Sequence, residues 1–356
     1  MEQKSPMKAL NEKLYQRQPL SKTEAASAFK QFVNGEQDPI SIAAFLVALK
    51  MKGESAEEVA GAAEALRDAA NFFDKPNYDT ADSCGTGGSG KHTLNISTLV
   101  SFIAAVKGLK MVKHGNRSIS SKCGSADVLE HLGVKIDMSP AIARRCLDET
   151  GVSFLFAPLY HPGVNHVMPV RNQLSTRTIF NLLGPLINPA NPQFQLMGVY
   201  SPDYCFAAAE SLRLSGCKAA MIVHSCGCDE ITLAGKTHVA ELKNGTIQEY
   251  TLSPQDFGLD SVPLNALFGG SPEENAKIFV DVLQGKAEQP VLDTVAANAG
   301  ALLYISGVSD SLKQGVVDAK MIISSGKAFD KLLALAEISQ STINPLNNSQ
   351  TEPAHV

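Results

Sequence analysis

The N-terminal part of the chain shows apolar residues at helical spacing, interrupted by start and stop signals for helices. Ser21 and Ser55 each precede a glutamate by three residues, which is the spacing of a capping box, and Gly53 is a stop signal. We expect four helices, at Met7–Arg17, Lys22–Val33, Pro39–Met51 and Ala56–Phe73. The pattern predicts an all-helical lobe whose apolar positions form a core or an interface rather than ligand contacts.

The pattern changes at about Tyr78, where short β-branched runs begin to alternate with helical stretches. These runs predict strands at Lys110–Val112, Val152–Phe156, Gln195–Val199 and Ala219–Val223. Such alternation is typical of an α/β domain, which binds ligands where a strand leads into a helix. The Asn-, Ser- and Gln-rich tail, 343–356, is expected to be frayed.

Composition narrows the class of protein. Of the 356 residues, 44% are hydrophobic and 19% charged, and no apolar run reaches the roughly 18 residues that span a bilayer. The formal net charge of -5 disfavours a general affinity for nucleic acid or anionic membranes. The seven cysteines show no paired C-x-x-C spacing, and the N-terminus lacks the apolar core of a secretory signal. We therefore expect a cytoplasmic protein that binds neither nucleic acid nor membrane.

A glycine-rich run carries the strongest chemical signal. It reads Asp82-Ser-Cys-Gly-Thr-Gly-Gly-Ser-Gly-Lys-His-Thr-Leu-Asn-Ile-Ser-Thr98 and leads into a helix-like segment at Asn95. Glycines let backbone N–H groups approach a ligand, and a helix N-terminus adds unpaired donors and the positive end of a dipole. We interpret the run as a phosphate-binding turn rather than an ordinary turn. Each glycine loses much conformational entropy when the chain folds, and an ordinary turn does not need so many of them.

The same run nearly matches the P-loop of nucleotide-binding enzymes. Gly85 to Lys91 fits the first seven positions of that pattern. His92 then stands where a hydroxyl must bind Mg²⁺, and Thr93 comes one residue too late. The P-loop interpretation is therefore weak.

A second polar run follows a short apolar stretch and reads Lys113-His-Gly-Asn-Arg-Ser-Ile-Ser-Ser-Lys-Cys-Gly-Ser125. Its cations, hydroxyls and glycines suit a loop that wraps a polyanion. Taken alone, the run fits a solvated loop equally well. Together with the glycine-rich run, it favours a ligand site.

The two runs resemble the anthranilate phosphoribosyltransferase family. The family pattern GTGG-x-G, N-I-S-T and K-H-G-N-R-S-x-S-S corresponds to Gly85-Thr-Gly-Gly88, Asn95-Ile-Ser-Thr98 and Lys113 to Ser121. The resemblance continues in order through Val170-Arg171, Arg177 to Pro189, Asp229-Glu230 and Thr251 to Leu259. It implies transfer of the phosphoribosyl group from 5-phospho-α-D-ribose 1-diphosphate to anthranilate. The products would be N-(5-phosphoribosyl)anthranilate and pyrophosphate, in L-tryptophan biosynthesis.

The resemblance also implies an α/β fold of the nucleoside-phosphorylase type. A small all-helical domain would comprise residues 1–76, joined by 169–187. A larger α/β domain with a central, mainly parallel sheet would comprise 77–168 and 188–342. The family further implies a homodimer joined through the small domains, which apolar faces on the opening helices would allow.

Site residues are implied by the same resemblance. The substrate carries a 5′-phosphate and a diphosphate, so two anion sites and Mg²⁺, implied as two ions per monomer, are expected. The metal ligands would be Ser97, Asp229 and Glu230. The residues implied for the diphosphate substrate are Gly85, Gly88, Ser89, Thr93, Asn95, Ile96, Ser97, Thr98, Lys113, His114, Gly115, Asn116, Arg117, Ser118, Ile119, Ser120, Ser121 and Ser125.

For anthranilate, the resemblance implies Gly85, Asn116 and Arg171. A guanidinium can donate two hydrogen bonds to the carboxylate of anthranilate. If the family resemblance is set aside, the expected role of Arg171 is a salt bridge that holds a helix in place. An aromatic amine is neutral at physiological pH and needs no strong base. We therefore assign no acid or base, and give His161 and His166, which we expect near the pocket, no catalytic role.

Two positions depart from the family pattern, and alternatives remain open. Ser89 stands where many members have Asp, and Lys91 makes the loop more positive, so we expect activity with shifted affinity for substrate or metal. A pyrimidine nucleoside phosphorylase-like enzyme and a non-catalytic nucleic-acid-binding relative are the competing hypotheses. Zinc at Cys226 and Cys228 is a remote interpretation, because a second ligand pair is missing.

Overall fold

The computed structural model describes residues 6–88, 90–118 and 122–342. The chain opens with a helical bundle in which the capping boxes of Ser21 and Ser55 are both formed, as predicted. Helix α4 ends before the predicted Phe73, because Asn71 donates its backbone N–H to the Tyr160 carbonyl at 2.7 Å and leads the chain away. The helices of the bundle are α1 (Pro6–Tyr15), α2 (Lys22–Val33), α3 (Pro39–Lys52) and α4 (Ala56–Asp68).

A seven-stranded sheet follows, with the strand order β3-β2-β1-β4-β5-β6-β7. The five strands from β3 to β5 are parallel, and β6 and β7 are added antiparallel, which confirms a mainly parallel sheet. The strands are β1 (Ala81–Gly85), β2 (Met111–Gly115), β3 (Val152–Phe156), β4 (Phe194–Gly198), β5 (Ala219–Ser225), β6 (Thr237–Lys243) and β7 (Thr246–Leu252).

Strands β1, β6 and β7 were not predicted from the sequence. The hairpin β6–β7 turns at Asn244-Gly245, where both residues have positive φ, 53° and 77°. An Asn-Gly pair between alternating apolar positions is a strong hairpin signal, and it would have identified both strands.

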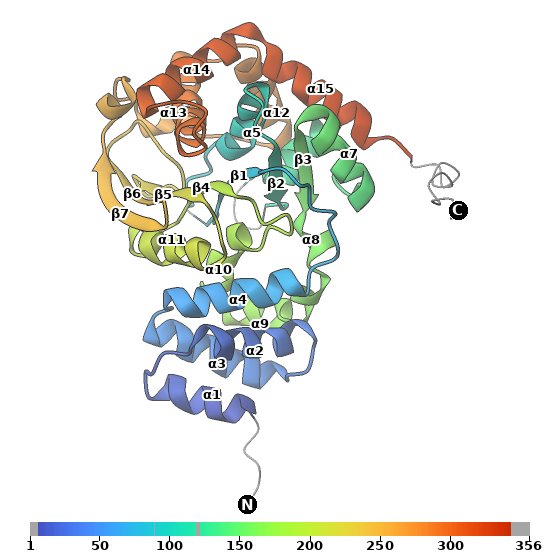
Figure 1. Ribbon diagram of the computed structural model, residues 1–356, viewed down its shortest axis with the longest axis vertical. Coiled ribbons are helices and arrows are strands. Elements are labelled where there is room, and N and C mark those ends of the chain that lie inside the picture. The colour runs from blue at the N-terminus through green and yellow to red at the C-terminus, as the bar shows by residue number, and fades with distance from the viewer. Residues whose placement is uncertain (1–5, 89, 119–121, 343–356) are drawn as a thin grey trace, which may run out of the picture.

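Helices cover both faces of the sheet (Figure 1). One hydrophobic core lies between one face of the sheet and the helices α5, α7 and α12 to α15. A second core lies between the opposite face of the sheet, α11 and the helical bundle. The helices after the bundle are α5 (Ile96–Val106), α6 (Ser125–His131), α7 (Pro140–Thr150), α8 (Ala157–Tyr160), α9 (Met168–Leu174), α10 (Phe180–Leu183), α11 (Cys205–Leu214), α12 (Pro272–Leu283), α13 (Gln289–Ile305), α14 (Leu312–Ser325) and α15 (Lys327–Ser339). Short 3₁₀ segments are η1 (Pro162–His166), η2 (Gly184–Leu186), η3 (Pro202–Tyr204), η4 (Pro254–Phe257) and η5 (Leu264–Leu267).

The middle of the chain returns to the helical bundle. Figure 1 shows α9 beside the opening helices, and Val170, Phe180 and Leu183 share the buried core of α2 to α4. This core also continues into the sheet through Met197 and Ile222. Because no break in packing marks the boundary, the division into 1–76 with 169–187 and the remainder stays a prediction.

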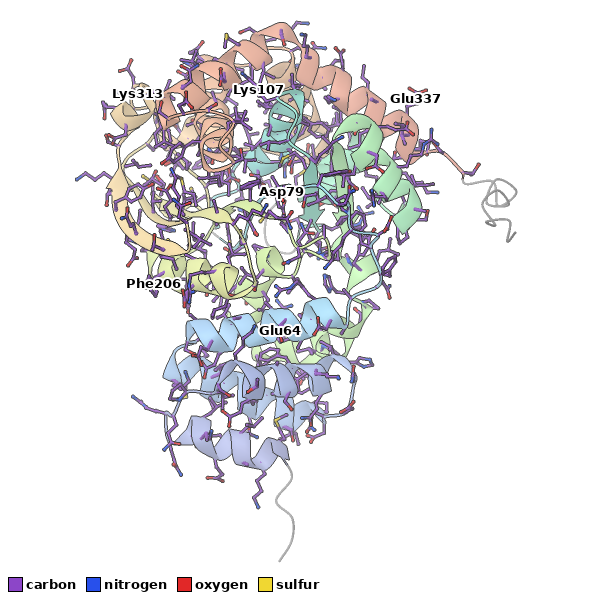
Figure 2. The ribbon with its side chains drawn as sticks, viewed as in Figure 1. Glu64, Asp79, Lys107, Phe206, Lys313 and Glu337 are labelled. Carbon is purple, nitrogen blue, oxygen red and sulfur yellow. The ribbon has the colours of Figure 1, made fainter. Side chains whose placement is uncertain are left out.

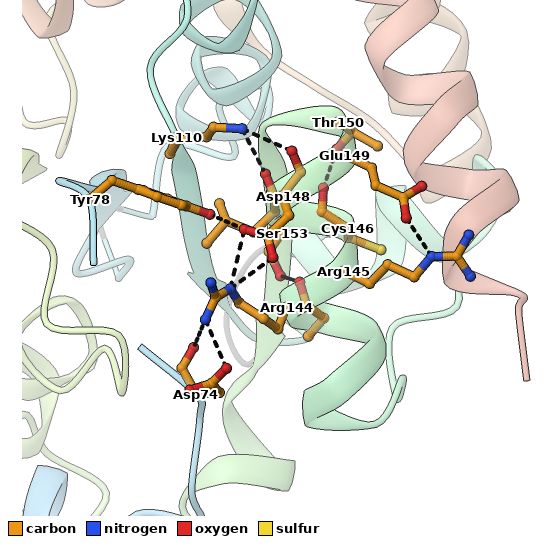
Figure 3. A network of polar contacts seen from close by, with 12 residues as sticks. Asp74, Tyr78, Lys110, Arg144, Arg145, Cys146, Asp148, Glu149, Thr150 and Ser153 are labelled. Atoms are coloured by element: carbon orange, nitrogen blue, oxygen red, sulfur yellow. Dashed lines mark hydrogen bonds and ion pairs between the residues drawn. The ribbon is translucent and has the colours of Figure 1, made fainter. Parts of the chain in front are cut away.

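The segment that enters the sheet from α4 is fastened to α7 (Figure 3). Arg144 donates to the Asp74 carboxylate at 2.8 Å and to Asp148 at 3.0 Å. The Tyr78 hydroxyl also donates to Asp148, and the Lys110 ammonium lies 5.6 Å from the Tyr78 ring centroid. These contacts fix the path of the chain into β1.

Ion pairs bind the outer helices to each other. Lys107, at the end of α5, pairs with Asp318 of α14 at 3.2 Å, and Figure 2 marks Lys107 on the side of the molecule away from the bundle. Within the described residues, no helix is both long enough and apolar enough to cross a membrane.

The sheet topology singles out one edge. Strand β1 lies between β2 and β4, so the chain leaves its carboxyl end toward one side of the sheet and leaves that of β4 toward the other. Ligands of open α/β sheets bind in the crevice at such a switch point. The carboxyl ends of β1 and β4 are therefore where a site is expected.

Candidate active site

The glycine-rich run forms the turn between β1 and α5 at this switch point. Gly87, Gly88 and Gly90 have φ of +69°, +74° and +71°, a region that side chains with a Cβ rarely adopt. Gly85 and Gly198, at the ends of β1 and β4, leave no room for a Cβ because each lies against Asp229. The sequence thus places an open turn of backbone donors directly beside an acidic residue.

Asp229 and Glu230 follow β5 and reach this turn. The Gly87 N–H donates to Asp229 Oδ2 at 2.7 Å. Burial raises the pKa of Glu230 well above its usual value, and the neighbouring Asp229 raises it further. Glu230 accepts a hydrogen bond from the Ser97 backbone, while its Oε2 is buried and has no partner among the described residues. A buried carboxylate with a free oxygen can accommodate a cation.

Lys113, in the middle of β2, supplies a buried positive charge to this site. It is only 4% exposed, and its ammonium donates to the Ser83 carbonyl at 2.6 Å and to Ser97 Oγ at 3.2 Å. The same ammonium favours the ionised form of Glu230. The structure therefore brings Gly85, Ser97, Lys113, Asp229 and Glu230 together from four separate segments.

The oxygen ligands fit Mg²⁺ better than zinc. Mg²⁺ is held by one or two carboxylates together with the substrate's phosphates, so a complete protein cage is not required. Among the residues that the structure describes, no cluster of three or more His, Cys, Asp or Glu could hold a metal. Cys226 is exposed while Cys228 is buried, so the two thiols give no evidence for zinc.

The second polar run forms a loop between β2 and α6. Asp127 organises its two ends by accepting from the backbone N–H of Ser118 at 3.0 Å and of Gly124 at 2.8 Å. Ser125 donates to the Asn116 carbonyl at 3.3 Å. Arg117 pairs with Glu130 at 2.7 Å on the surface, so a carboxylate already compensates its charge. Predicted site residues outside the described part of the chain are Ser89, Ile119, Ser120 and Ser121.

The start of α5 differs from the prediction in detail. Asn95 is the N-cap, but its amide donates to the Cys123 carbonyl at 3.2 Å instead of capping the helix. Ile96 is a core residue at 1% exposure, and Thr98 is buried with no partner for its hydroxyl in the described residues. Thr93 makes an isolated bridge to Phe268. Asn95 therefore links the glycine turn to the second loop.

Arg171 lies on α9, in the segment that returns to the bundle. Its guanidinium lies 5.1 Å from the Phe180 ring centroid, and burial lowers its pKa. No carboxylate pairs with it within the described residues, so the salt bridge expected by default is not found there. A half-buried guanidinium without a counter-ion is suited to bind an anionic ligand.

Two histidines form a buried pair where the second run meets the bundle. The ring centroids of His114 and His161 lie 5.2 Å apart, and His114 Nδ1 is 3.1 Å from the Gly184 carbonyl. Burial lowers the pKa of His114 to about 3 and that of His161 to about 4, so both rings are neutral. His166, which we expect near the pocket, is exposed and lies against Gly35.

Comparison with known proteins agrees with this geometry. The model of the helical bundle domain of a glycosyl transferase family matches residues 8–70, and the model of its a/b domain matches residues 77–329. The anthranilate phosphoribosyltransferase of Aeromonas hydrophila is 51% identical over 92% of this chain and 95% of its own length. That of Vibrio parahaemolyticus is 50% identical over 93% of this chain and 99% of its own.

This chain belongs to the anthranilate phosphoribosyltransferase family.

Solved structures of anthranilate phosphoribosyltransferases share the fold. The enzyme from Thermus thermophilus aligns with a TM-score of 0.89 and 40% identity, over 93% of this chain and 99% of that one. The enzyme from Saccharomyces cerevisiae, in complex with PRPP and Mg, aligns with a TM-score of 0.86 and 28% identity, over 95% of this chain and 99% of that one. The predicted fold class and family are thereby confirmed.

Three residues at this anthranilate phosphoribosyltransferase site, Asp82, Asn188 and Arg177, were given no role in the sequence analysis. Asp82 is fully buried in β1 and accepts from the Asn188 amide at 2.9 Å, next to Lys113, and its place at the head of the glycine-rich run was the available signal. Arg177 donates to the Gly88 carbonyl, although its motif had been given no role.

We expect the buried histidine pair to make folding stability depend on pH. In the unfolded chain both rings ionise near 6.5, whereas the folded chain takes up these protons only near pH 3 and 4. Between these values the unfolded chain binds more protons, so stability is retained above 6.5 and falls as the pH is lowered. At pH 5.5 the loss is about 1 kcal/mol per histidine.

Urea unfolding at pH 7.5 and 5.5 measures this loss. The variant His161→Gln should lose about half as much stability as the wild type over that interval, because one of the two groups is gone. An unchanged pH dependence would show that His161 is not held neutral by the fold.

Proposed function

We propose that the chain transfers the phosphoribosyl group of 5-phospho-α-D-ribose 1-diphosphate to the amine of anthranilate, with release of pyrophosphate. The observation that carries the proposal is the convergence of the glycine turn, Lys113 and the Asp229–Glu230 pair at the switch point of the sheet. Membership in the anthranilate phosphoribosyltransferase family supports it. The product, N-(5-phosphoribosyl)anthranilate, belongs to L-tryptophan biosynthesis.

The diphosphate would bind at the turn between β1 and α5. Backbone N–H groups of a glycine turn and the start of α5 provide donors for phosphate oxygens, and Lys113 provides a charge. Ser97 would hold one Mg²⁺ together with the substrate, and Asp229 with Glu230 would hold a second. Bound Mg²⁺ would neutralise charge on the diphosphate and make it a better leaving group.

Anthranilate would bind between the second loop and α9. The carboxylate would pair with Arg171, whose guanidinium is half-buried and has no carboxylate partner among the described residues. Asn116 would contact the acceptor, and Gly85 would allow it to approach the anomeric carbon.

The chain's residues act in this mechanism by orientation and by charge. The amine attacks the anomeric carbon from the face opposite the diphosphate while the bond from that carbon to the diphosphate breaks, which inverts the carbon, and positive charge develops on the ribose ring. The acidic ammonium formed at the nitrogen then loses its proton to water. The loop donors hold the departing oxygens, and Arg171 holds the acceptor in line. The neutral amine needs no strong base, and the neutral His114–His161 pair is consistent with that.

Consumption of anthranilate, followed by its fluorescence with phosphoribosyl diphosphate and Mg²⁺, tests the proposal. A chelator should abolish the signal change. Phosphorolysis of thymidine or uridine without anthranilate turnover would favour a pyrimidine nucleoside phosphorylase instead. Salt-sensitive DNA binding by an inactive chain would favour a nucleic-acid-binding relative.

We also propose a homodimer joined through the bundle and a cytoplasmic location. Ile40, Val47 and Met51 of α3 are 81%, 37% and 70% exposed, and their spacing places them on one helical stripe. Exposed apolar stripes of this kind mark interaction surfaces.

The proposed cytoplasmic location rests on the cysteines. Buried thiols such as Cys84 and Cys146 are compatible with a reducing compartment.

Light scattering should therefore give a mass near twice 37.9 kDa for the wild type. The variant Ile40→Glu with Met51→Glu should give the monomer mass, because two carboxylates would have to be buried at the interface. The variant Val317→Glu with Met321→Glu, on exposed positions of α14, is the matched control and should remain a dimer. A dimer unaffected by the α3 changes would contradict this interface.

A further inference from the structure

Arg177 lies in the segment between α9 and α10, six residues after Arg171. Its guanidinium donates from Nη2 to the carbonyl of Gly88 in the glycine turn. Gly88 has a φ of +74°, so its peptide groups have more orientations available than those of other residues. The contact therefore restrains a part of the turn whose backbone has few intrinsic constraints.

The guanidinium itself is held by an aromatic ring. Arg177 lies over Tyr200, which follows β4, with 4.4 Å between the guanidinium carbon and the ring centroid. The ring of Tyr204 lies 5.2 Å from that of Tyr200, and its hydroxyl donates to Glu54 at 3.3 Å. A continuous chain of contacts thus runs from the α3–α4 junction of the bundle to the glycine turn.

A second side chain, that of Asp229, also restrains the turn. Asp229 accepts from the N–H of Gly87, while Arg177 donates to the C=O of Gly88. A peptide group is planar, so fixing a carbonyl fixes the orientation of the whole group to which it belongs. Two side chains, Asp229 and Arg177, therefore restrain how the turn presents its backbone.

We propose that Arg177 is a positioning residue, which is stacked on Tyr200 and sets the glycine turn in the orientation that receives the diphosphate. The inference rests on the proposed function. Ordering a flexible loop in advance removes an entropic penalty from binding, so loss of this contact weakens binding of phosphoribosyl diphosphate. Arg171 lies six residues earlier, on α9, so the proposed anchor for the acceptor and the proposed support of the diphosphate turn are close in sequence.

A simple charge effect is the alternative, in which Arg177 attracts the diphosphate as any cation would. The geometry favours positioning, since a planar guanidinium can lie flat on a ring and donate a directed bond from its edge at the same time, whereas an ammonium has no plane to stack and its donors are not held in a fixed fork. The Arg177→Lys variant keeps the charge and loses this geometry. It therefore separates the two explanations.

The experiment measures equilibrium binding of phosphoribosyl diphosphate with Mg²⁺ by calorimetry, which does not depend on the acceptor. Arg177→Lys and Tyr200→Leu should each raise Kd about tenfold. The double variant should raise it no further, because both changes break one contact. Tyr200→Phe retains the ring and should bind more tightly than Tyr200→Leu. Arg145→Lys, on a surface ion pair of α7, is the matched control and should bind like the wild type.

Three results would overturn the inference. These are wild-type binding by Arg177→Lys, additive effects in the double variant, or equal weakening by Tyr200→Phe and Tyr200→Leu. Circular dichroism of every variant checks the fold, and the Tyr200 series still tests the stacking contact if an Arg177 variant unfolds. Turnover of anthranilate by the wild type tests the proposed function separately, since a failure there leaves the binding result standing.

Discussion

Replacing Asp229 with Asn and Glu230 with Gln should lower turnover by about a thousand-fold or more. The two carboxylates are the acidic groups at the glycine turn, and Glu230 keeps a buried oxygen without a partner in the described part of the chain. Their removal would leave the charge of the departing diphosphate without the metal that these residues are proposed to hold. Steady-state turnover of anthranilate at saturating Mg²⁺ measures the effect.

The fold of this double variant should stay intact. The amide oxygen introduced by Asp229→Asn can still accept from the Gly87 N–H, and Glu230→Gln keeps the shape of a buried side chain whose ionisation burial disfavours. The melting temperature should therefore be unchanged or slightly higher. Asp260→Asn with Glu288→Gln makes the same charge change at exposed positions and should leave turnover at the wild-type level. Wild-type turnover in the Asp229/Glu230 variant would refute the metal assignment.

The second large effect is expected at Arg171. Arg171→Ala should raise the KM for anthranilate about 30- to 150-fold, because a charge-assisted hydrogen bond to a half-buried group contributes about 2–3 kcal/mol. The KM for phosphoribosyl diphosphate should change little, since Arg171 lies on α9 and the diphosphate is proposed to bind at the turn after β1. Initial rates with each substrate varied in turn give both constants.

Two further variants make this test more specific. Arg171→Lys keeps the charge but offers no planar pair of donors, so it should recover only part of the loss. Arg145→Ala removes an exposed guanidinium of α7 and should alter neither constant. If Arg171→Ala raised both KM values equally, Arg171 would not be the carboxylate anchor.

Local signals explain which helices could be predicted. The starts of α2 and α4 are set by serine hydroxyls and glutamates within one turn, so their prediction needs no tertiary contact. The end of α4 depends instead on Asn71 meeting the Tyr160 carbonyl, far away in sequence. The start of a helix at about Asn95 could likewise be predicted locally, whereas the partner of the Asn95 side chain, the Cys123 carbonyl, could not be foreseen because it is 28 residues away.

The candidate site was predicted as a set of residues rather than as a geometry. The motifs named the glycine turn, Lys113 and the acid pair, and these lie together. The motifs gave Arg117 no surface partner and Arg177 no role, although the first pairs with Glu130 and the second holds Gly88. Side-chain direction depends on neighbours brought in by folding, so a motif alone does not fix it.

The sequence by itself determined the chemistry that is available: glycines before a helix, a second run with cations and serines, paired acids, and an arginine in the returning segment. The reason is that backbone freedom, charge and capping are properties of residues and their immediate neighbours. Only the tertiary structure decided that β4 pairs with β1, that Asp229 accepts a hydrogen bond from Gly87, and that the Glu230 carboxyl is buried away from solvent. Those outcomes depend on packing between segments more than a hundred residues apart, where burial alters a carboxylate in ways that its sequence neighbours cannot.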